Sequence, residues 1–421
     1  SQFSYMQVVL GYVVGYVVII KVLLPLYYRM QLTSIYTYLD TRFGGVSYKT
    51  GSVFFLLSRI IGASFRLYLV AIVLQITVFD ALGVSFFITV AVTIGLIWIY
   101  TFRSGIKTII WTDTLQTTFM LGAVIVTVIL IKKHMLPDTG LVEYIANSDH
   151  SQIFFFEDWK GANHFWKQFL SGVFITIVMT GLDQDMMQKN LSCRNLADAQ
   201  KNMFWLSVTL VVVNLIFLSL GVLLYDFAEA QSIAFEKPDE LFPAVAMSGQ
   251  LGMIVVVLFV IGLIAAAYSS ADSALTALTT SFCVDILGIE RMEGVRGKQI
   301  RKFTHIGFSL VLFIVIVIFE KLNNDSVIKE LFTVAGYTYG PILGLYAFGL
   351  FTKINVRDKW VPVVAVIAPV LSYVIKDHSE EWFGYAMSFE HLILNGLIMF
   401  IGLWILRIND ANPEQQKRSV V

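Results

Sequence analysis

The chain has 421 residues, of which 57% are hydrophobic and only 14% are charged, whereas an ordinary soluble domain carries roughly 25% charged residues. A surface this poor in charge excludes a soluble enzyme, a disordered chain and a fibrous protein. The 30 basic and 30 acidic residues balance, which gives no reason to expect a nucleic-acid partner. The two cysteines, Cys193 and Cys283, indicate neither a disulfide framework nor a metal cluster.

Eleven stretches are long and apolar enough, or nearly so, to cross a hydrocarbon core of about 30 Å, which takes about 20 helical residues. The sequence therefore predicts an all-α polytopic membrane protein. The seventh stretch is too long for one straight span, and we expect it to tilt or to extend into the cytoplasm. The stretches are residues 4–27, 52–79, 83–102, 105–131, 166–188, 203–225, 249–283, 303–319, 327–351, 359–375 and 387–406.

Lysine and arginine in the loops predict the orientation of these spans. Every second loop, starting after the first span and including the tail, holds 19 of these residues, and the other loops hold six. Basic residues favour the cytoplasmic side, so the C-terminus is expected inside and the first residue outside. Ser1 to Ser4 lead straight into a span without an initiator Met or a signal peptide, and we expect preceding sequence to be missing.

Asp113 is the first of four polar features inside these spans. It lies about eight residues into the stretch 105–131, roughly 12 Å deep at about 1.5 Å per residue. A carboxylate at that depth is costly and is a functional candidate by default. Two interpretations remain: it binds a cation or a proton, or it is a structural carboxylate bonded to neighbouring hydroxyls or to an arginine.

A stripe of small residues and hydroxyls is the second feature. Ala266, Ser269, Ser270 and Ser273 fall on one helical face about 100° wide, and Asp272 flanks it. Hydroxyl, carbonyl and carboxylate oxygens are the ligands that hard cations prefer. The alternative is close helix packing, since small-residue stripes commonly let membrane helices touch.

Basic side chains inside spans are the remaining two features. Arg59 and Arg66 lie seven residues apart on one face of the second span. Arg59 is close enough to the cytoplasmic end to snorkel toward it, as is Lys21 in the first span. Arg66 lies nearer the middle, where it pairs with Asp113 or Asp272, or binds an anionic group of a substrate.

The motifs of several other classes are absent from the sequence. The six histidines fall in loops or near span ends, and neither an H-E-x-x-H zinc motif nor a G-x-x-x-x-G-K-[ST] phosphate loop occurs. These absences favour a passive or ion-coupled carrier over an enzyme or an ATP-driven pump. A channel would need a continuous polar pore lining, which the sparse polar clusters do not provide.

Six short motifs occur in order along nearly the whole chain, and together they resemble those of the sodium:solute symporter family, which includes sodium–glucose and sodium–sialic acid cotransporters. Asp183–Lys189 resembles the family's D-Q-x-x-x-Q-R motif. In chain order, the segments are Trp111–Gln116 (W/Y-T-D-x-x-Q), Asp183–Lys189, Asn195–Lys201, Pro238–Pro243, Ala266–Ser273 and Tyr337–Pro341.

The resemblance implies a leucine-transporter-type fold, in which two inverted five-helix repeats contain broken helices at the centre. In that frame residues 1–421 form one transporter domain. Core helices two to ten cover about 4–351, peripheral helices about 359–406, and a cytoplasmic tail 407–421. The first peripheral helix and core helix one are expected to be missing, although core helix one supplies half of the main sodium site.

The resemblance also implies sodium as the coupling ion, with no organic cofactor. A main sodium site would use the backbone carbonyl of Ala266 and the hydroxyls of Ser269 and Ser270.

A second sodium site, found in some family members, is implied at Asp113. Ser269, Asp272 and Ser273 would face it. Asp272 departs from members that carry a hydroxyl there, so it is either a sodium ligand or a partner of Arg66.

The substrate pocket is implied less completely by the resemblance. Arg59 or Arg66 takes the place of the carboxylate-binding arginine of sialic acid transporters. Thr333 stands where glucose cotransporters carry a sugar-contacting glutamine, which argues against glucose recognition of that kind. The candidate substrate residues are Gln7, Tyr12, Arg59, Arg66, Asn214 and Thr333.

Together these features predict a sodium-coupled symporter, not an enzyme, that imports a small polar organic solute such as a sugar or a sialic acid by alternating access. Its partners are the solute, sodium ions and the lipid bilayer, with no nucleic acid, and it is expected to work as a monomer. The expected location is the bacterial cytoplasmic (inner) membrane, with the C-terminus in the cytoplasm. The alternative is a membrane solute sensor built on the same fold.

Overall fold

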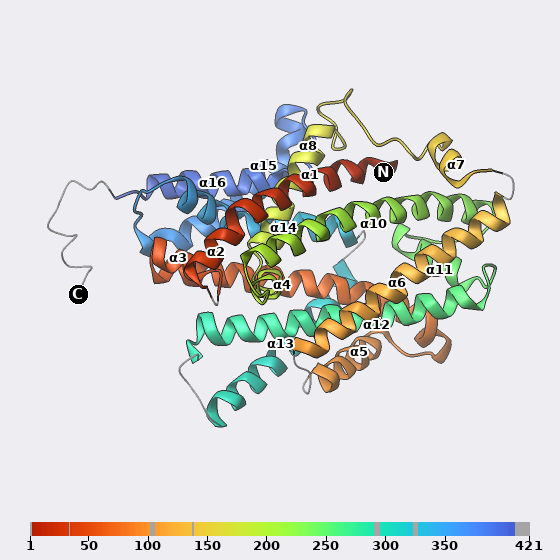
Figure 1. Cartoon of the computed structure of the whole chain (residues 1–421), viewed down its shortest axis with the longest axis horizontal. Helices are drawn as coiled ribbons and strands as arrows, with labels where there is room; N and C mark the ends of the chain where they lie inside the picture. The colour runs from red at the N-terminus through yellow and green to blue at the C-terminus, as the bar shows by residue number, and fades with distance from the viewer. Residues whose placement is uncertain are drawn as a thin grey trace.

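The computed structural model describes residues 2–32, 34–101, 106–136, 139–289, 295–322 and 327–408. Within these ranges the regular structure is helical, apart from one β-bridge between Val356 and Arg407. Figure 1 shows long helices running roughly along the longest axis of the molecule, with α7 at one end and α3 at the other. The all-α prediction is therefore confirmed for the described residues.

In the first part of the chain, two long helices continue through π-helical turns (η2 and η3). The elements are η1 Gln2–Ser4, α1 Tyr5–Val18, η2 Ile19–Leu23, α2 Leu24–Met30, α3 Thr37–Arg42, α4 Gly45–Leu74, η3 Gln75–Phe79, η4 Asp80–Leu82, α5 Phe86–Thr101, α6 Ile106–Met135 and α7 Leu141–Asn147.

In the rest of the chain, two more π-helical turns (η5 and η7) follow α8 and α12. The elements are α8 Phe165–Thr176, η5 Ile177–Gly181, α9 Gln184–Leu191, α10 Leu196–Ala230, η6 Pro238–Glu240, α11 Leu241–Met247, α12 Met253–Ser281, η7 Phe282–Ile286, α13 Val295–Leu322, α14 Val327–Phe351, η9 Asp358–Trp360, α15 Val361–Phe383 and α16 His391–Ile405.

Ten of the eleven expected spans each coincide with a continuous helical segment, and the span 166–188 coincides with a bent pair of helices. Seven helices of the described part are long and apolar enough to cross a membrane, and a bent pair, Phe165–Gly181 with Gln184–Leu191, makes an eighth. α5 and α16 are shorter apolar helices, and α14 covers the expected stretch 327–351. The architecture of many apolar helices is confirmed, whereas the count of eleven spans is supported only in part.

The expected span 166–188 is not one continuous helix, and this corrects the sequence-based boundary. α8 and η5 end at Gly181, and α9 begins at Gln184 after a bend of 65°. The bend arises because the backbone of Asp183 is extended, with φ −102° and ψ 122°, so that its side chain caps α9. An Asp at an N-cap satisfies amide groups that have no partner within the helix.

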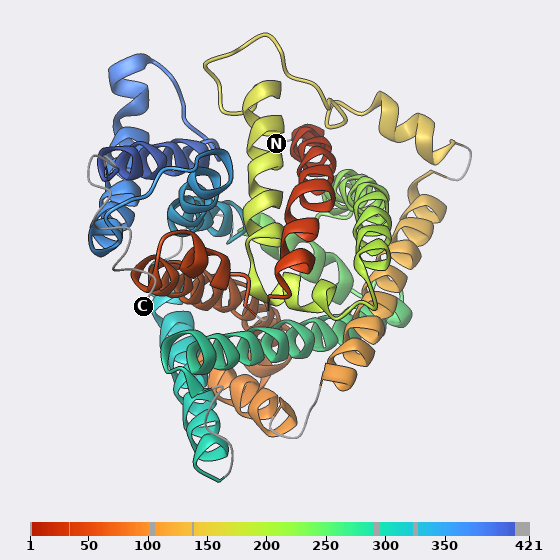
Figure 2. The same cartoon turned by 60° about the vertical axis from the view of Figure 1, so that its left-hand side comes forward.

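α1 and α8 lie side by side, which Figures 1 and 2 both show. Two glycines allow the close approach. A Cβ atom on Gly11 would lie 2.1 Å from the carbonyl oxygen of Phe169, and one on Gly172 would lie 2.1 Å from the carbonyl oxygen of Val8. Small residues bring membrane helices together in this way.

α4 runs through the middle of the bundle and contacts α12, α13 and α14. α14 in turn packs against α16. There, a Cβ atom on Gly336 would lie 2.1 Å from the ring of His391, and one on Gly340 would lie 2.2 Å from the side chain of Asn395. α4 is therefore packed against three long helices, one of which is itself tightly packed against α16.

Polar contacts tie together three of the segments expected on the cytoplasmic side. Arg42 donates to the carbonyl oxygens of Thr352 and Ile354 at 3.0 and 2.9 Å. The carboxylate of Asp358 accepts from the amides of Val46 and Ser47 at the start of α4, where a helix attracts negative charge. The β-bridge between Val356 and Arg407 connects the segment after α16 to these contacts. These segments therefore lie at one end of the bundle, as the loop charges predict.

Candidate functional site

A cavity of about 300 Å³, here called the central cavity, lies where α1, α4, α8–η5–α9, α10, α12 and α14 meet. A smaller cavity lies between α4, η5 and α14, and Arg59 and Arg66 line both. The other polar groups of the central cavity include the hydroxyl of Ser273, the carboxylate of Asp185 and the amine of Lys189. Charged groups in the centre of an apolar bundle mark a substrate or ion pathway by default.

The break between η5 and α9 leaves backbone groups without helical partners, and tyrosines satisfy them. The carbonyl oxygen of Gly181 accepts from the hydroxyl of Tyr27 at 2.9 Å, and that of Leu182 accepts from Tyr36 at 2.8 Å. Irregular backbone is tolerated at membrane depth when the surrounding protein supplies such partners. The bend is therefore a supported element of the fold.

Asp183 holds the break from the other side. Its Oδ1 accepts from the amide of Met186 at 3.1 Å, and its Oδ2 accepts from the hydroxyl of Tyr339 in α14 at 2.6 Å. This buried carboxylate thereby connects the start of α9 to α14.

Arg59 forms a buried ion pair with Asp185, through its Nη2 and the carboxylate Oδ2. Both side chains are about nine-tenths buried, with 9% and 10% exposed. The sequence-based interpretations of Arg59, snorkelling or substrate binding, did not include this partner. Because the pair is enclosed, it fixes α9 against α4 and leaves little of the guanidinium for a solute.

Arg66 has a different environment, although it lies on the same face of α4. Its side chain is exposed and lines both cavities. Among the described residues it makes no hydrogen bond or ion pair, so the predicted pairs with Asp113 and Asp272 are not formed. The guanidinium is therefore available to the cavities.

Lys189 joins two of the residues expected at the second sodium site. Its Nζ donates to the hydroxyl of Ser273 at 2.8 Å and lies 3.5 Å from Oδ2 of Asp113. Asp272 is buried beside them in α12, where its carboxylate accepts from the hydroxyl of Thr276 at 3.4 Å. The structure thus brings α6, α9 and α12 together around the amine of Lys189.

The main sodium site lies largely outside the described residues. The side chains of Ser269 and Ser270 belong to the part of α12 that is not described, and only Ala266, which is half-buried, can be placed. The predicted assignment of these three residues to sodium stays a prediction.

Of the remaining candidate substrate residues, only Tyr12 lines the central cavity, and its hydroxyl lies 2.8 Å from that of Tyr5. Gln7 is buried and faces the loop before α8, where it donates to the carbonyl of Asn163 at 3.0 Å and accepts from the amide of Phe155 at 3.2 Å. It lines neither cavity.

Asn214 and Thr333 also lie away from both cavities. The amide of Asn214 donates to the carbonyl of Leu210 in its own helix at 2.8 Å. The hydroxyl of Thr333 lies 3.5 Å from the amine of Lys376 in α15, and its carbonyl lies 2.9 Å from His391 Nε2. Thr333 therefore faces the peripheral helices.

The segment Asp183–Lys189 was recognised in the sequence only as a motif, and no role was predicted for its residues. Three of them, Asp183, Asp185 and Lys189, hold α9 in place. The available signal was a run of polar residues at the end of an apolar stretch, where a break in the helix would place them inside the bundle. Tyr339, within the motif Tyr337–Pro341, was missed in the same way.

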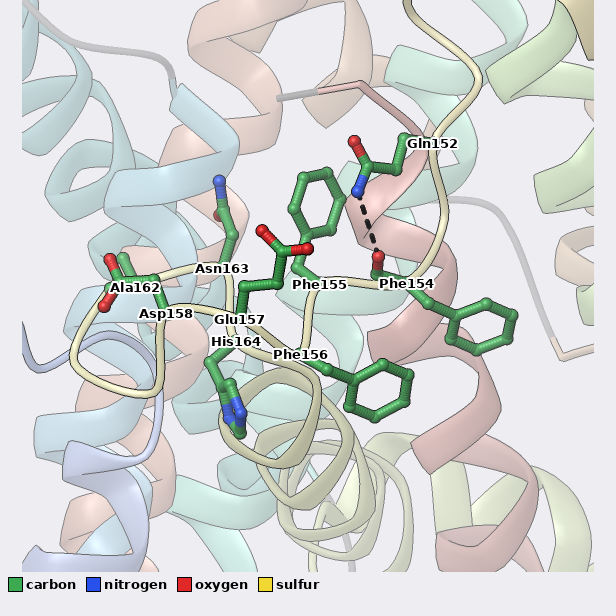
Figure 3. A pocket seen from close by; sticks show the side chains of 10 residues that line it. Gln152, Phe154, Phe155, Phe156, Glu157, Asp158, Ala162, Asn163 and His164 are labelled. Atoms are coloured by element: carbon green, nitrogen blue, oxygen red, sulfur yellow. Dashed lines mark hydrogen bonds between the residues drawn. The ribbon is translucent and has the colours of Figure 1, made fainter.

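A larger cavity, of about 530 Å³, lies elsewhere, in the loop that leads to α8. Figure 3 shows its lining, with the rings of Phe154 and Phe156 turned outward from the loop and the carboxylate of Glu157 between its two arms. It shares no lining residue with the central cavity. Its charged side chains, Glu157 and Asp158, are exposed, whereas Arg59 and Asp185 of the central cavity are buried.

Comparison with known proteins agrees with this arrangement. Residues 1–357 match the model of the sodium:solute symporter family. The chain belongs to this family. It is 26% identical over 369 residues to the sodium/sialic acid symporter of Aliivibrio fischeri, covering 83% of this chain and 70% of that protein.

Two further relatives are much longer than this chain. The chain is 28% identical to the rabbit (Oryctolagus cuniculus) sodium-dependent multivitamin transporter, over 81% of this chain and 54% of the transporter. It is 23% identical to the human sodium/iodide cotransporter, over 83% of this chain and 55% of the cotransporter. The chain thus spans only about half the length of these two.

Among solved structures, a Na⁺-coupled sialic acid symporter in a substrate-bound outward-open state aligns with a TM-score of 0.72 at 20% identity, covering 96% of this chain and 86% of that one. The likeness confirms the leucine-transporter-type fold. The family and the relatives are sodium-coupled membrane transporters and not enzymes. The predicted class, with sodium as the coupling ion, is thus confirmed at the level of the family.

Proposed function

We propose that this protein is a sodium-coupled symporter that imports a small organic anion, such as an acidic sugar or a monocarboxylate, by alternating access. The observation that carries the choice of an anion is Arg66, whose guanidinium opens to both cavities and has no ion-pair partner among the described residues. A charge inside an apolar bundle is costly, and a carboxylate can offset that cost by a bidentate pair with arginine.

The names of several relatives support an anionic solute. Sialic acid, iodide and monocarboxylates, which are all anions, occur in the names of proteins that are 23–26% identical to this chain. Arg66 is assigned the anionic group and Tyr12 the neighbouring polar contact. Gln7, Asn214 and Thr333 are given no solute contact, because they line neither cavity.

Sodium would bind first and favour the state that is open to the outside. Ala266, Ser269 and Ser270 are assigned to the main sodium site. If sodium raises the affinity for the solute, the solute must raise the affinity for sodium by the same factor, and this reciprocity is the coupling.

Thermal unfolding of the purified full-length protein tests the proposal. Melting temperatures are measured in sodium and in potassium, with sialic acids, monocarboxylates, neutral sugars and amino acids. We expect an anion to raise the melting temperature only in sodium. Arg66→Ala should weaken the binding of that anion about tenfold or more, because a hydrogen bond to a charged group contributes about 1.5–3 kcal/mol.

Two variants make this result specific. Arg66→Lys keeps the charge but loses the bidentate geometry, so part of the affinity should return, and Arg301→Ala, at an exposed position of α13, should leave it unchanged. The shift produced by sodium alone should persist in Arg66→Ala. If a neutral solute stabilises Arg66→Ala to the same extent as the parent, the proposal that the solute is an anion is wrong. If neither sodium nor any solute stabilises the protein, the solute sensor takes the place of the symporter.

We further propose one transporter domain, working as a monomer in the bacterial cytoplasmic membrane with its C-terminus inside. The excess of basic residues in the loops at one end of the bundle supports this orientation. Labelling of a cysteine introduced in the 352–359 loop by a reagent that does not cross membranes checks it. If the reagent labels this cysteine in intact cells, the loop lies outside and the proposed orientation is wrong.

A further inference from the structure

We propose that the amine of Lys189 occupies the position of a second sodium ion, between Asp113 and Ser273, so that this carrier binds one sodium ion where the expected residues alone would hold two. The inference rests on the proposed function as a sodium symporter. It concerns the number of ions bound and the residue that determines this number.

The contacts of Lys189 are those a bound cation would make. Its Nζ donates to the hydroxyl oxygen of Ser273 at 2.8 Å and lies 3.5 Å from a carboxylate oxygen of Asp113. These oxygens come from two different helices, α12 and α6, which no local motif of α9 brings together. Hydroxyl and carboxylate oxygens are the ligands that a hard cation prefers.

An ammonium group suits the position because it carries the charge of one sodium ion on a flexible stem, with three donors. It also excludes sodium, because two positive charges at this spacing repel each other where water is limited. Since Lys189 is attached to the chain, its effective concentration at the site is high, and free sodium competes with it poorly.

The fold holds Lys189 in this position. Residues four apart on a helix share a face, so Asp185 and Lys189 point the same way from α9. Asp185 is fixed by its ion pair with Arg59 of α4, and the first turn of α9 is capped by Asp183. α9 is therefore oriented by two independent contacts before Lys189 reaches Ser273.

A surface ion pair is the alternative, because the side chains of Lys189 and Asp113 are 45% and 35% exposed. Two features favour the ion position. Ser273 is only 5% exposed, so the lysine reaches a buried hydroxyl that a surface pair would not involve. Both Lys189 and Ser273 also line the central cavity, from which an ion would arrive.

Equilibrium binding of radioactive sodium to the purified full-length protein, without solute, counts the ions directly. We expect about one sodium ion per chain in the parent and about two in Lys189→Gln, with a steeper, cooperative binding curve. Lys189→Arg keeps the positive charge and should stay near one. Lys201→Gln, the matched control at an exposed position at the start of α10, should also stay near one.

The combined variant Lys189→Gln/Asp113→Asn identifies the added site. It should lose the second ion, because the carboxylate that would hold it is gone. Two ions in the parent, or no additional ion in a folded Lys189→Gln, would overturn the inference while leaving the symporter intact. No sodium bound by the parent would instead overturn the proposed function. If Lys189→Gln does not fold, the number of sodium ions bound by the parent and by the variant Lys189→Ala, which has a smaller side chain, tests the inference instead.

Discussion

The two halves of the bent helix are held in opposite ways. α8 lies against α1 by steric fit, since Gly11 and Gly172 each leave room for a carbonyl of the other helix. α9 is held by side-chain polar contacts, namely the ion pair to Arg59 and the contacts of Asp183 and Lys189. The halves meet at the bend of 65°.

This difference separates a fixed part from an exchangeable one. Close backbone packing has one good geometry and is lost when the helices move apart. Ion pairs and hydrogen bonds can exchange their partners for water, an ion or a solute at a small net change in free energy. We therefore expect α8 to move together with α1, and α9 to rearrange when the central cavity opens.

The largest test breaks the steric half. Gly172→Leu places a side chain where a Cβ atom alone would lie 2.1 Å from the carbonyl oxygen of Val8. We expect a loss of more than about 4 kcal/mol in the free energy of unfolding, a size that marks exceptional mutations. Denaturation of the purified protein measures it. Gly122→Leu in α6, where a Cβ atom meets nothing within 4 Å, is the control, and equal losses would contradict the comparison.

The second test breaks the ion pair of the polar half. Asp185→Ala leaves the guanidinium of Arg59 buried without its partner, which costs about 3–5 kcal/mol. The double variant Arg59→Met/Asp185→Leu removes both charges and should recover most of that loss, as measured by the same denaturation. If the double variant is as unstable as the single one, the loss comes from packing and not from the unpaired charge.

The smallest test removes one hydrogen bond. Tyr339→Phe deletes the hydroxyl that donates to Asp183 at 2.6 Å, and we expect a loss of about 1–3 kcal/mol, because a buried acceptor is left without a donor. Tyr373→Phe, with a side chain that is 55% exposed, is the control for stability. Solute uptake should slow in Tyr339→Phe alone. Unchanged stability and uptake would show that Asp183 is held by its other contacts.

The sequence predicted the helices well because apolar length is a local property. All eleven expected stretches are helical apart from the break within 166–188, and the motifs led to the correct family. The bend after Gly181 was not predicted as a boundary, since the break at Asp183 is supported by Tyr27, Tyr36 and Tyr339, which converge on one turn. These partners are distant in the sequence, and an apolar stretch carries no sign of them.

The pairing of charges was harder to predict than their presence. Arg59, Arg66 and Asp113 were recognised as unusual, but their partners depend on which helix faces are opposed. Asp185 lay near the end of the expected span 166–188 without an assigned role, and Lys189 was assigned to the loop that follows it. They enter the bundle only because the chain bends at Asp183, so a continuous helix would have placed them elsewhere.

The π-helical turn η5, Ile177–Gly181, has a consequence for the register of the chain. A π-turn holds one residue more than the regular helix around it would contain. The wider turn absorbs that residue within a single turn, so the helix that precedes it keeps its faces. Thr176 before the π-turn and Met179 and Thr180 within it therefore all line the central cavity. The spare residue thus acts as a spacer that widens the last turn of this helix before the chain bends into α9.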